Sequence, residues 1–158
     1  MNSMERGRRM KILIVEDDDI KRNRISGFLK QAYPSAEIEE NASYQSGLGS
    51  VLNSKFDMII LDMTMPIFDV SPEEDGGRPQ PYAGRKILQQ MKRRNINASV
   101  IIVTQFDIFG DEKNTKTLFE LNKELTQEFQ GLYKGSVFYH ASQDRWQDEL
   151  KLLIGRNV

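Results

Sequence analysis

The sequence contains no cysteine and only one histidine, His140. These absences exclude disulfides, thiolate metal ligands, a cysteine nucleophile and a zinc site built from several histidines. Acidic and basic residues almost balance, at 23 and 22, so the basic excess of a nucleic-acid-binding protein is missing. No apolar run approaches the ~20 residues of a membrane span, and the polar start lacks the apolar core of a signal peptide. We therefore expect a cytoplasmic protein that binds neither nucleic acid nor membrane.

Strand-like runs alternate with helix-like stretches throughout the 158 residues, a length that suits one domain. Three of these runs, at 11–15, 56–61 and 99–103, are almost continuously apolar, as expected for strands buried on both faces. A short polar run at 36–39 suits an edge strand, and the last run covers 136–140. The strict alternation predicts an α/β fold, a doubly wound parallel five-stranded sheet with helices on both faces.

The expected domain covers residues 10–156, after a flexible basic tail at 1–9. Within it, residues 69–82 are rich in proline, glycine and acidic side chains, which predicts an exposed loop inserted between a strand and its helix. Leucines from Leu118 onwards recur at steps of three and four, which predicts an extended fourth helix. At its far end, Phe129 and Leu132 are expected to reach beyond the core and to form a partner surface.

Acidic side chains and a hydroxyl follow the three buried strands, at the end where open parallel sheets bind ligands. Glu16 and Asp17 follow the first strand, Asp62 follows the third and Thr104 ends the fourth. With the strand order 2-1-3-4-5, the first and third strands are neighbours ~4.8 Å apart, so the three acids would converge. Such a group raises a pKa or attracts a hard cation with oxygen ligands, such as Mg²⁺. The alternative is that these acids only solvate loops.

At this point the sequence resembles a known family, the response-regulator receiver domains of two-component signalling. Residues 12–18 resemble the first strand and acid pair of that family, and residues 100–104 resemble its fourth strand and hydroxyl. Residues 56–66 resemble the phospho-acceptor segment, including the Met65-Pro66 pair that follows it. The resemblance covers about residues 10 to 155 and implies a flavodoxin-like receiver fold.

The resemblance also implies roles for individual residues. Asp62 would be the phospho-acceptor, and Thr104 would hydrogen-bond the phosphoryl group. Mg²⁺ would be held by Glu16, Asp17, Asp62 and the backbone carbonyl of Thr64. The implied partners are a sensor histidine kinase or phosphotransfer protein of a phosphorelay and a downstream protein effector. The oligomeric state stays open, a homodimer included.

One departure from the family concerns a lysine that the family places at the end of the fifth strand. Alignment puts Tyr139 there, and a slip of one residue puts His140 there. Either residue would act as a substitute or as a switch, or would simply pack against the last helix. Lys113, Lys116 and Arg145 lie in segments that begin near the site, so one of them is a further source of positive charge.

A second departure is the 69–82 insertion, which leaves the sheet on the site side and brings Glu73, Glu74 and Asp75 close to the acceptor.

Two functions therefore stay open. The first is a stand-alone atypical receiver that is phosphorylated on Asp62 and signals through protein contacts. The second is a pseudo-receiver, an interaction module that is regulated without phosphorylation. An enzyme is not expected, because Thr64 occupies the place of the second aspartate of haloacid-dehalogenase phosphatases.

Overall fold

The computed structural model describes residues 8–69, 79–110 and 113–158. A parallel sheet has the order β2-β1-β3-β4-β7, which confirms the predicted 2-1-3-4-5 arrangement because β7 is the fifth strand of this sheet. Its strands are β1 (Lys11–Val15), β2 (Glu37–Asn41), β3 (Met58–Leu61), β4 (Ser99–Thr104) and β7 (Tyr133–Phe138).

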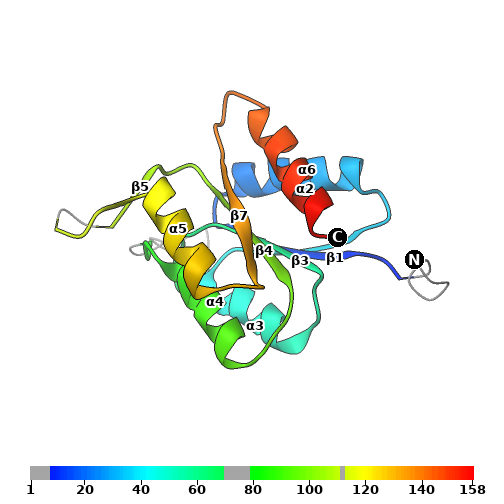
Figure 1. Cartoon of the computed structure of the whole chain (residues 1–158). Coiled ribbons are helices and arrows are strands. Elements are labelled where there is room, and N and C mark those ends of the chain that lie inside the picture. The colour runs from blue at the N-terminus through cyan, green and yellow to red at the C-terminus, as the bar shows by residue number, and fades with distance from the viewer. Residues whose placement is uncertain (1–7, 70–78, 111–112) are drawn as a thin grey trace.

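Helices cover both faces of this sheet, as Figure 1 shows. On one face lie α2 (Asp19–Ala32) and α6 (Arg145–Arg156), and on the other lie α3 (Tyr44–Asn53), α4 (Ala83–Arg93) and α5 (Leu118–Glu128). Each helix lays its apolar side on the sheet, where Ile25, Leu88 and Leu150 are fully or almost fully buried. Within the described part of the chain, none of the helices is both long and apolar enough to cross a membrane.

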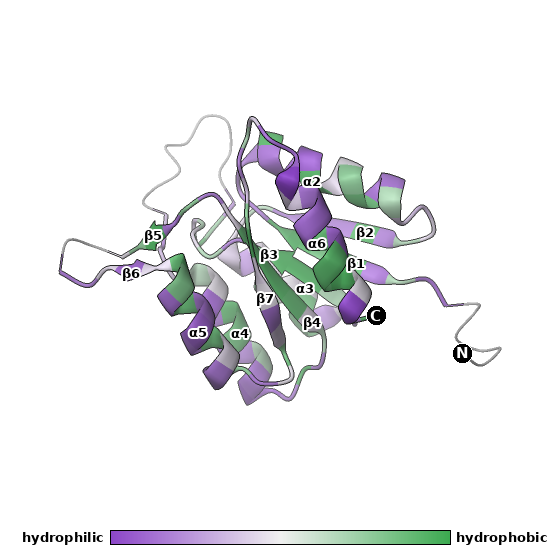
Figure 2. Ribbon diagram, turned by 45° about the horizontal axis from the view of Figure 1, so that its top comes forward, coloured by the Kyte–Doolittle hydropathy of each residue, from purple (hydrophilic) through white to green (hydrophobic). Residues whose placement is uncertain are grey.

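The central strands are buried on both faces because neighbouring side chains point to opposite sides of the sheet. In β1, Leu13 belongs to the core layer shared with α3, α4 and α5, whereas Ile12 and Ile14 belong to the layer shared with α2 and α6. Figure 2 shows the result as hydrophobic strands between helices with polar outer faces. This double burial explains the continuous apolar runs of the sequence.

The extra length before residue 132 does not extend a helix, so the predicted extended fourth helix is wrong. α5 has 11 residues, the same number as α4. The additional residues instead form an antiparallel pair, β5 (Ile108–Phe109) and β6 (Lys116–Thr117), ahead of α5. The hairpin projects from the sheet at the carboxyl ends of the strands (Figure 1).

The predicted partner surface at the end of that helix is also wrong. Phe129 is 1% exposed and Leu132 is 8% exposed, and both belong to the core. The helix ends at Glu128, after which the chain turns and the carbonyl of Leu132 accepts a hydrogen bond from the N–H of Val100. The turn carries both apolar side chains back under the sheet.

The last strand has different bounds from those expected, and the structure describes little of the N-terminal tail and of the insertion. The last strand begins at Tyr133 and ends at Phe138, so Tyr139 and His140 follow the strand instead of ending it. Most of the tail at 1–9 and of the insertion at 69–82, including Glu73, Glu74 and Asp75, lies outside the described residues. Arg8 is described, and its guanidinium pairs with the carboxylate of Asp57 at 2.8 Å.

Candidate functional site

Strand register brings Glu16 and Asp62 together. Val15 and Leu61 are paired neighbours in β1 and β3, so the residues that follow them leave adjacent strands at the same edge of the sheet. The N–H of Asp62 donates to the carbonyl of Val15, which fixes the two chains at this point. Both acidic residues are only 2% exposed.

A lysine that sequence analysis did not select lies between these two acids. The ammonium of Lys21 is 2.8 Å from Oδ2 of Asp62 and 2.5 Å from Oε1 of Glu16. It also donates to the carbonyl of Val103 at 2.9 Å. Lys21 is 1% exposed, which is rare for a lysine and is tolerated only when the charge is paired.

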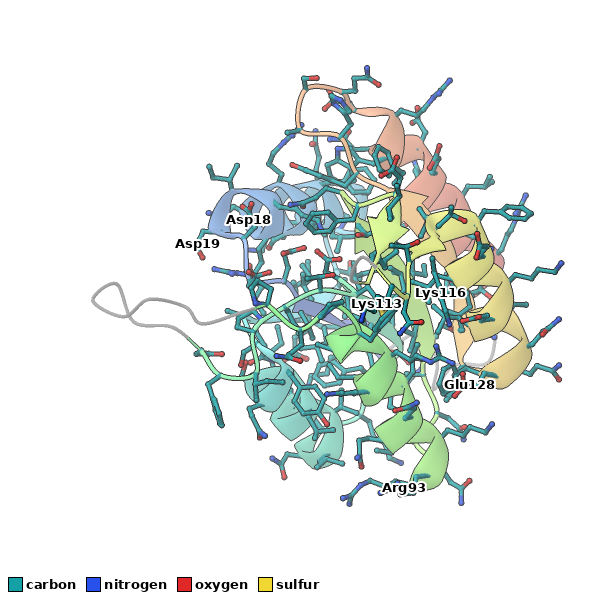
Figure 3. All side chains as sticks on the ribbon, turned by 90° about the vertical axis from the view of Figure 1, so that its left-hand side faces the viewer. Asp18, Asp19, Arg93, Lys113, Lys116 and Glu128 are labelled. Carbon is teal, nitrogen blue, oxygen red and sulfur yellow. The ribbon has the colours of Figure 1, made fainter. Side chains whose placement is uncertain are left out.

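Helix α2 delivers Lys21 to this position. The side chain of Asp18 caps the helix by accepting the N–H of Lys21 at 3.0 Å. Arg22 donates to the carbonyl of Glu16 and so ties the first turn of the helix to the end of β1. Figure 3 labels Asp18 and Asp19, which begin this helix beside the sheet.

Each carboxylate of the cluster is also held by backbone. Oδ1 of Asp62 accepts the N–H of Met63 at 2.6 Å, and Oε2 of Glu16 accepts the N–H of Asp18 at 3.1 Å. The two acids therefore have little freedom to rotate, because each of them uses one oxygen for a backbone bond and the other for Lys21. Hydrogen bonds of this kind to charged groups are among the strong ones in proteins.

Burial changes the titration of this cluster. Burial, with the charge of Asp62 beside it, raises the pKa of Glu16 to about 8 against the opposing effect of Lys21. Burial alone would lower the pKa of Lys21, but the carboxylates of Asp62 and Glu16 outweigh it and raise that pKa above its ordinary value. The lysine therefore stays cationic, and the cluster carries less negative charge than its acids would carry in water.

Thr104 lies at the same edge, at the end of β4, and is fully buried. Its hydroxyl oxygen accepts the N–H of Phe106 at 3.2 Å, in the loop that leads to the hairpin. Its carbonyl accepts the N–H of Tyr139 at 2.7 Å. The residue before it, Val103, supplies the carbonyl that Lys21 contacts, so β4 is connected to the acid cluster through its backbone.

Asp17 lies beside Glu16, but in the described residues the three acids do not form a group arranged to hold a metal ion. Asp17 is exposed at the rim, and the space between the other two acids holds Lys21. Partial desolvation nevertheless raises the pKa of Asp17, and the charge of Asp62 contributes to this rise. Asp17 is therefore close enough to Asp62 to share its electrostatic environment.

The oxygen atoms present fit Mg²⁺ chemically. In the described ranges, no three acidic or histidine side chains gather closely enough to form a metal cluster. Mg²⁺ does not need such a cluster, because it binds through one or two carboxylates and keeps several waters. Asp17 and Asp62 supply carboxylates of this kind. Thr64, whose hydroxyl donates to the carbonyl of Pro81 at 3.3 Å, lies two residues after Asp62 and is half-buried.

The segment after Asp62 is packed tightly against α4. A Cβ atom added at Gly84 would lie 2.5 Å from the carbonyl oxygen of Asp62 and 2.5 Å from Cδ1 of Leu61. The N–H of Gly84 donates to the carbonyl of Met63 at 3.0 Å. Only glycine allows α4 to approach the candidate acceptor this closely.

Two of the other residues expected to supply positive charge, His140 and Lys116, have partners outside the acid cluster. His140 is exposed, and its Nδ1 contacts the hydroxyl of Ser142. Lys116 pairs with Glu124 at 2.7 Å. Tyr139 is buried near the cluster, with its ring centre 5.6 Å from the ammonium of Lys21, and its hydroxyl accepts from Arg24.

Lys21 could have been found from the sequence by its spacing. It precedes Ile25 by four residues and Leu29 by eight, so it lies on the buried face of its helix. A charged residue on that face, one turn after the acidic strand end, points at the site.

Comparisons with known proteins agree with this geometry. The sequence model of the response regulator receiver domain family matches residues 12–122. The chain is 32% identical over 143 residues to the Detocs response regulatory protein DtcB of Enterobacter cloacae, covering 89% of this chain and 95% of that protein.

Solved structures show the same fold. Chemotaxis response regulator CheY4 of Vibrio cholerae is 18% identical, with a TM-score of 0.61, and 96% of this chain and 100% of that chain are covered. Response regulator protein TrrA of Thermotoga maritima, in complex with Mg²⁺ and BeF, is 17% identical, with a TM-score of 0.60 and coverage of 91% and 98%. With its sheet order, its acids at the strand ends and these matches, the chain belongs to the response regulator receiver domain family.

Proposed function

We propose that this chain is an atypical receiver that is phosphorylated on Asp62 and signals through protein contacts. The observation that carries the proposal is the meeting of Asp62 with Glu16 and a buried ammonium at the strand ends. The phosphoryl donor would be the phosphohistidine of a sensor kinase or phosphotransfer protein, and the recipient of the signal a protein effector. Similarity to DtcB, whose name describes a response regulatory protein, supports this class of function.

In the proposed transfer, a carboxylate oxygen of Asp62 forms a bond to phosphorus as the bond between phosphorus and the donor histidine breaks. The electron pair of the broken bond leaves with the histidine nitrogen. The N–H of Met63 holds the other end of the carboxylate, so the attacking oxygen keeps its direction. The hydroxyl of Thr104, whose oxygen accepts the N–H of Phe106, would donate its proton to a phosphoryl oxygen, and the reorientation of this residue would move the loop after β4.

Asp17, Asp62, Glu16 and the backbone carbonyl of Thr64 would hold Mg²⁺. The metal, when bound, offsets negative charge as the phosphoryl group arrives. TrrA, which shares this fold, was solved with Mg²⁺ and BeF. That structure and the oxygen donors at the strand ends support Mg²⁺ as the cofactor.

A second candidate function is a pseudo-receiver that acts through association without phosphorylation. It is favoured by the burial of the acceptor, since Asp62 is 2% exposed and Lys21 already neutralises its charge. A site of this kind is stable without a metal or a phosphoryl group. Phosphorylation, in contrast, requires the loops around Asp62 to open towards the donor.

Mass measurement after incubation with Mg²⁺ and acetyl phosphate tests the proposal. The wild type should gain the mass of one phosphoryl group, and Asp62→Asn should gain none. Asp57→Asn is the matched control, because Asp57 precedes the same strand at its other end and pairs with Arg8. If Asp62→Asn forms as much adduct as the wild type, Asp62 is not the acceptor. If neither the wild type nor Asp57→Asn forms an adduct, the pseudo-receiver is favoured.

A further inference from the structure

We infer that Lys21, from helix α2, is the cation that binds the phosphoryl group of this receiver, in place of the lysine that the family carries at the end of the fifth strand. The inference rests on the proposed function, because it assigns a role in the phosphorylated state of Asp62. Three observations support it. They are the burial of Lys21, the contacts of its ammonium, and the position of the Tyr139 ring directly after β7.

The burial of Lys21 distinguishes it from an ordinary helix lysine. A lysine in the first turns of a surface helix normally extends into water, yet Lys21 is 1% exposed. Its ammonium has three N–H donors, and Asp62, Glu16 and the carbonyl of Val103 are within reach of them. The whole side chain is thus directed into the acid cluster and does not bridge to another part of the surface.

The position that alignment without a gap assigns to the family's lysine holds an aromatic ring. Tyr139 follows β7 and is 4% exposed, and its N–H is bonded to the carbonyl of Thr104. Its ring centre lies 5.6 Å from the ammonium of Lys21, and its hydroxyl accepts from Arg24 at 2.8 Å. The tyrosine therefore forms a wall beside the ammonium, and the face of its ring favours a cation there.

The position of the ammonium suits a phosphoryl group on Asp62. It is 2.8 Å from Oδ2, so an oxygen of a phosphoryl group on this carboxylate would lie within reach of the same donor. An aspartyl phosphate carries about −1.5 to −2 charges in place of the single charge of the carboxylate, and Glu16 is a second acid beside it. Exchanging the carboxylate oxygen of Asp62 for a phosphoryl oxygen keeps the ammonium of Lys21 paired and brings a positive charge to the new group.

A lysine on α2 also changes which element responds to phosphorylation. The N–H of Lys21 is held by the side chain of Asp18, and its ammonium contacts the end of β4 through Val103. A shift of the ammonium therefore acts on the start of α2 and on β4, whereas a lysine on the fifth strand would act on β7.

The test compares phosphorylation by acetyl phosphate with Mg²⁺ in three variants. Lys21→Met should form the Asp62 adduct about 10- to 100-fold more slowly, which corresponds to the loss of a hydrogen bond between charged groups. Lys30→Met, the same change on the exposed side of the same helix, should keep the wild-type rate. The double variant Lys21→Met/Tyr139→Lys returns the lysine to the position of the family and should recover part of the rate.

A measurement on the wild type covers the case in which Lys21→Met does not fold. Beryllofluoride with Mg²⁺ should shift the Cε signal of Lys21 in carbon NMR spectra of the wild type but not of Asp62→Asn. A wild-type rate for Lys21→Met, or an unmoved Lys21 signal while beryllofluoride binds, overturns the inference and leaves the proposed function intact. Absence of any adduct or beryllofluoride binding on the wild type overturns both.

Discussion

The ammonium of Lys21 lies 2.8 Å from a carboxylate oxygen of Asp62, although 41 positions separate the two residues in the sequence. This contact joins the first turns of α2 to the end of β3. Two buried acids at neighbouring strand ends would repel each other without a cation between them. The site therefore contains its own counter-ion, and the loops around it are held in place before any ligand binds.

The first prediction concerns the stability that this counter-ion provides. Lys21→Met should lower the free energy of unfolding at pH 7 by about 3–5 kcal/mol, because it leaves Glu16 and Asp62 buried without their cation. Adding Glu16→Gln to Lys21→Met should recover part of the loss, because a neutral glutamine needs neither a cation nor a shift of its pKa at this buried position. Urea unfolding followed by circular dichroism measures both. Lys30→Met should stay within about 0.5 kcal/mol of the wild type, and equal stability of Lys21→Met would contradict the prediction.

Much of this site was predictable because the apolar runs of two buried strands locate its acids. Continuous apolar runs predicted the buried strands, and the residues after those runs are Glu16 and Asp62, which the structure brings together. The sequence does not single out Lys21 as readily, because the family pattern places its cation at the end of the fifth strand. In the sequence it stands among Asp19, Ile20 and Arg22, a run that resembles the exposed start of a helix.

The expectation of an extended fourth helix was wrong for a similar reason. Apolar residues at helical spacing continue past Glu128, and the sequence does not reveal that the chain turns there. Phe129 ends the helix with a hydrogen bond from its N–H to the carbonyl of Leu125, and it stays in the core from a different element. The extra residues were assigned to the helix because the strands β5 and β6 have only two residues each, too few to show a period.

The second prediction concerns Mg²⁺. Asp17→Asn should weaken Mg²⁺ binding by about tenfold or more, because a neutral amide is a poorer ligand for a hard cation than a carboxylate. Asp19→Asn is the matched control, since Asp19 is exposed two positions later and pairs with Arg22. Isothermal titration of both variants against the wild type measures the difference. Equal affinities for Asp17→Asn and the wild type would exclude Asp17 as a ligand.

The third prediction concerns Arg24, which connects α2 to the loop before α6. Its guanidinium donates to the hydroxyl of Tyr139, the carbonyl of Ala141 and a carboxylate oxygen of Asp144. It also lies over the rings of Tyr139 and Trp146, at 5.5 Å and 5.9 Å from their centres.

Arg24→Met should keep the apolar stem of the side chain but remove these bonds. We expect a loss of about 1–3 kcal/mol in unfolding free energy and faster hydrogen exchange between residues 139 and 144. Arg93→Met, at the exposed end of α4 labelled in Figure 3, should change neither. Unchanged exchange in Arg24→Met would mean that the loop is held by other contacts.

The fourth prediction concerns stability at high pH. Burial raises the pKa of Tyr133 to about 12, although the hydrogen bond with Ser136 lowers it slightly. Tyrosine in the unfolded chain ionises near 10, so the unfolded state loses its proton first and gains in stability as the pH rises. The contribution of Tyr133 to stability is therefore complete below about pH 10 and falls by about 2–3 kcal/mol up to pH 12.

Urea unfolding between pH 9 and pH 12 measures this loss. Tyr133→Phe should be less stable than the wild type at pH 9, because it lacks the hydrogen bond of the hydroxyl to Asn122. It should then lose less stability than the wild type as the pH rises, since its ring cannot ionise. Parallel curves for the two proteins would show that Tyr133 does not titrate as its burial requires.

The last prediction concerns the close approach of α4 to the acceptor. Gly84→Ala should lower the free energy of unfolding by about 1–3 kcal/mol, because its Cβ would lie 2.5 Å from the carbonyl oxygen of Asp62. The clash moves backbone at the acceptor, so the phosphorylation rate should fall as well. Gly49→Ala is the matched control, since Gly49 is inside α3 and a Cβ there meets no atom within 4 Å. Alanine is the better helix former, so Gly49→Ala should be stabilising by about 0.5–1 kcal/mol. Thermal unfolding measures the stability of both variants, and acetyl phosphate labelling measures their phosphorylation rates. If Gly84→Ala equals Gly49→Ala in both stability and rate, then the acceptor loop tolerates displacement, and the packing of α4 does not fix the position of Asp62.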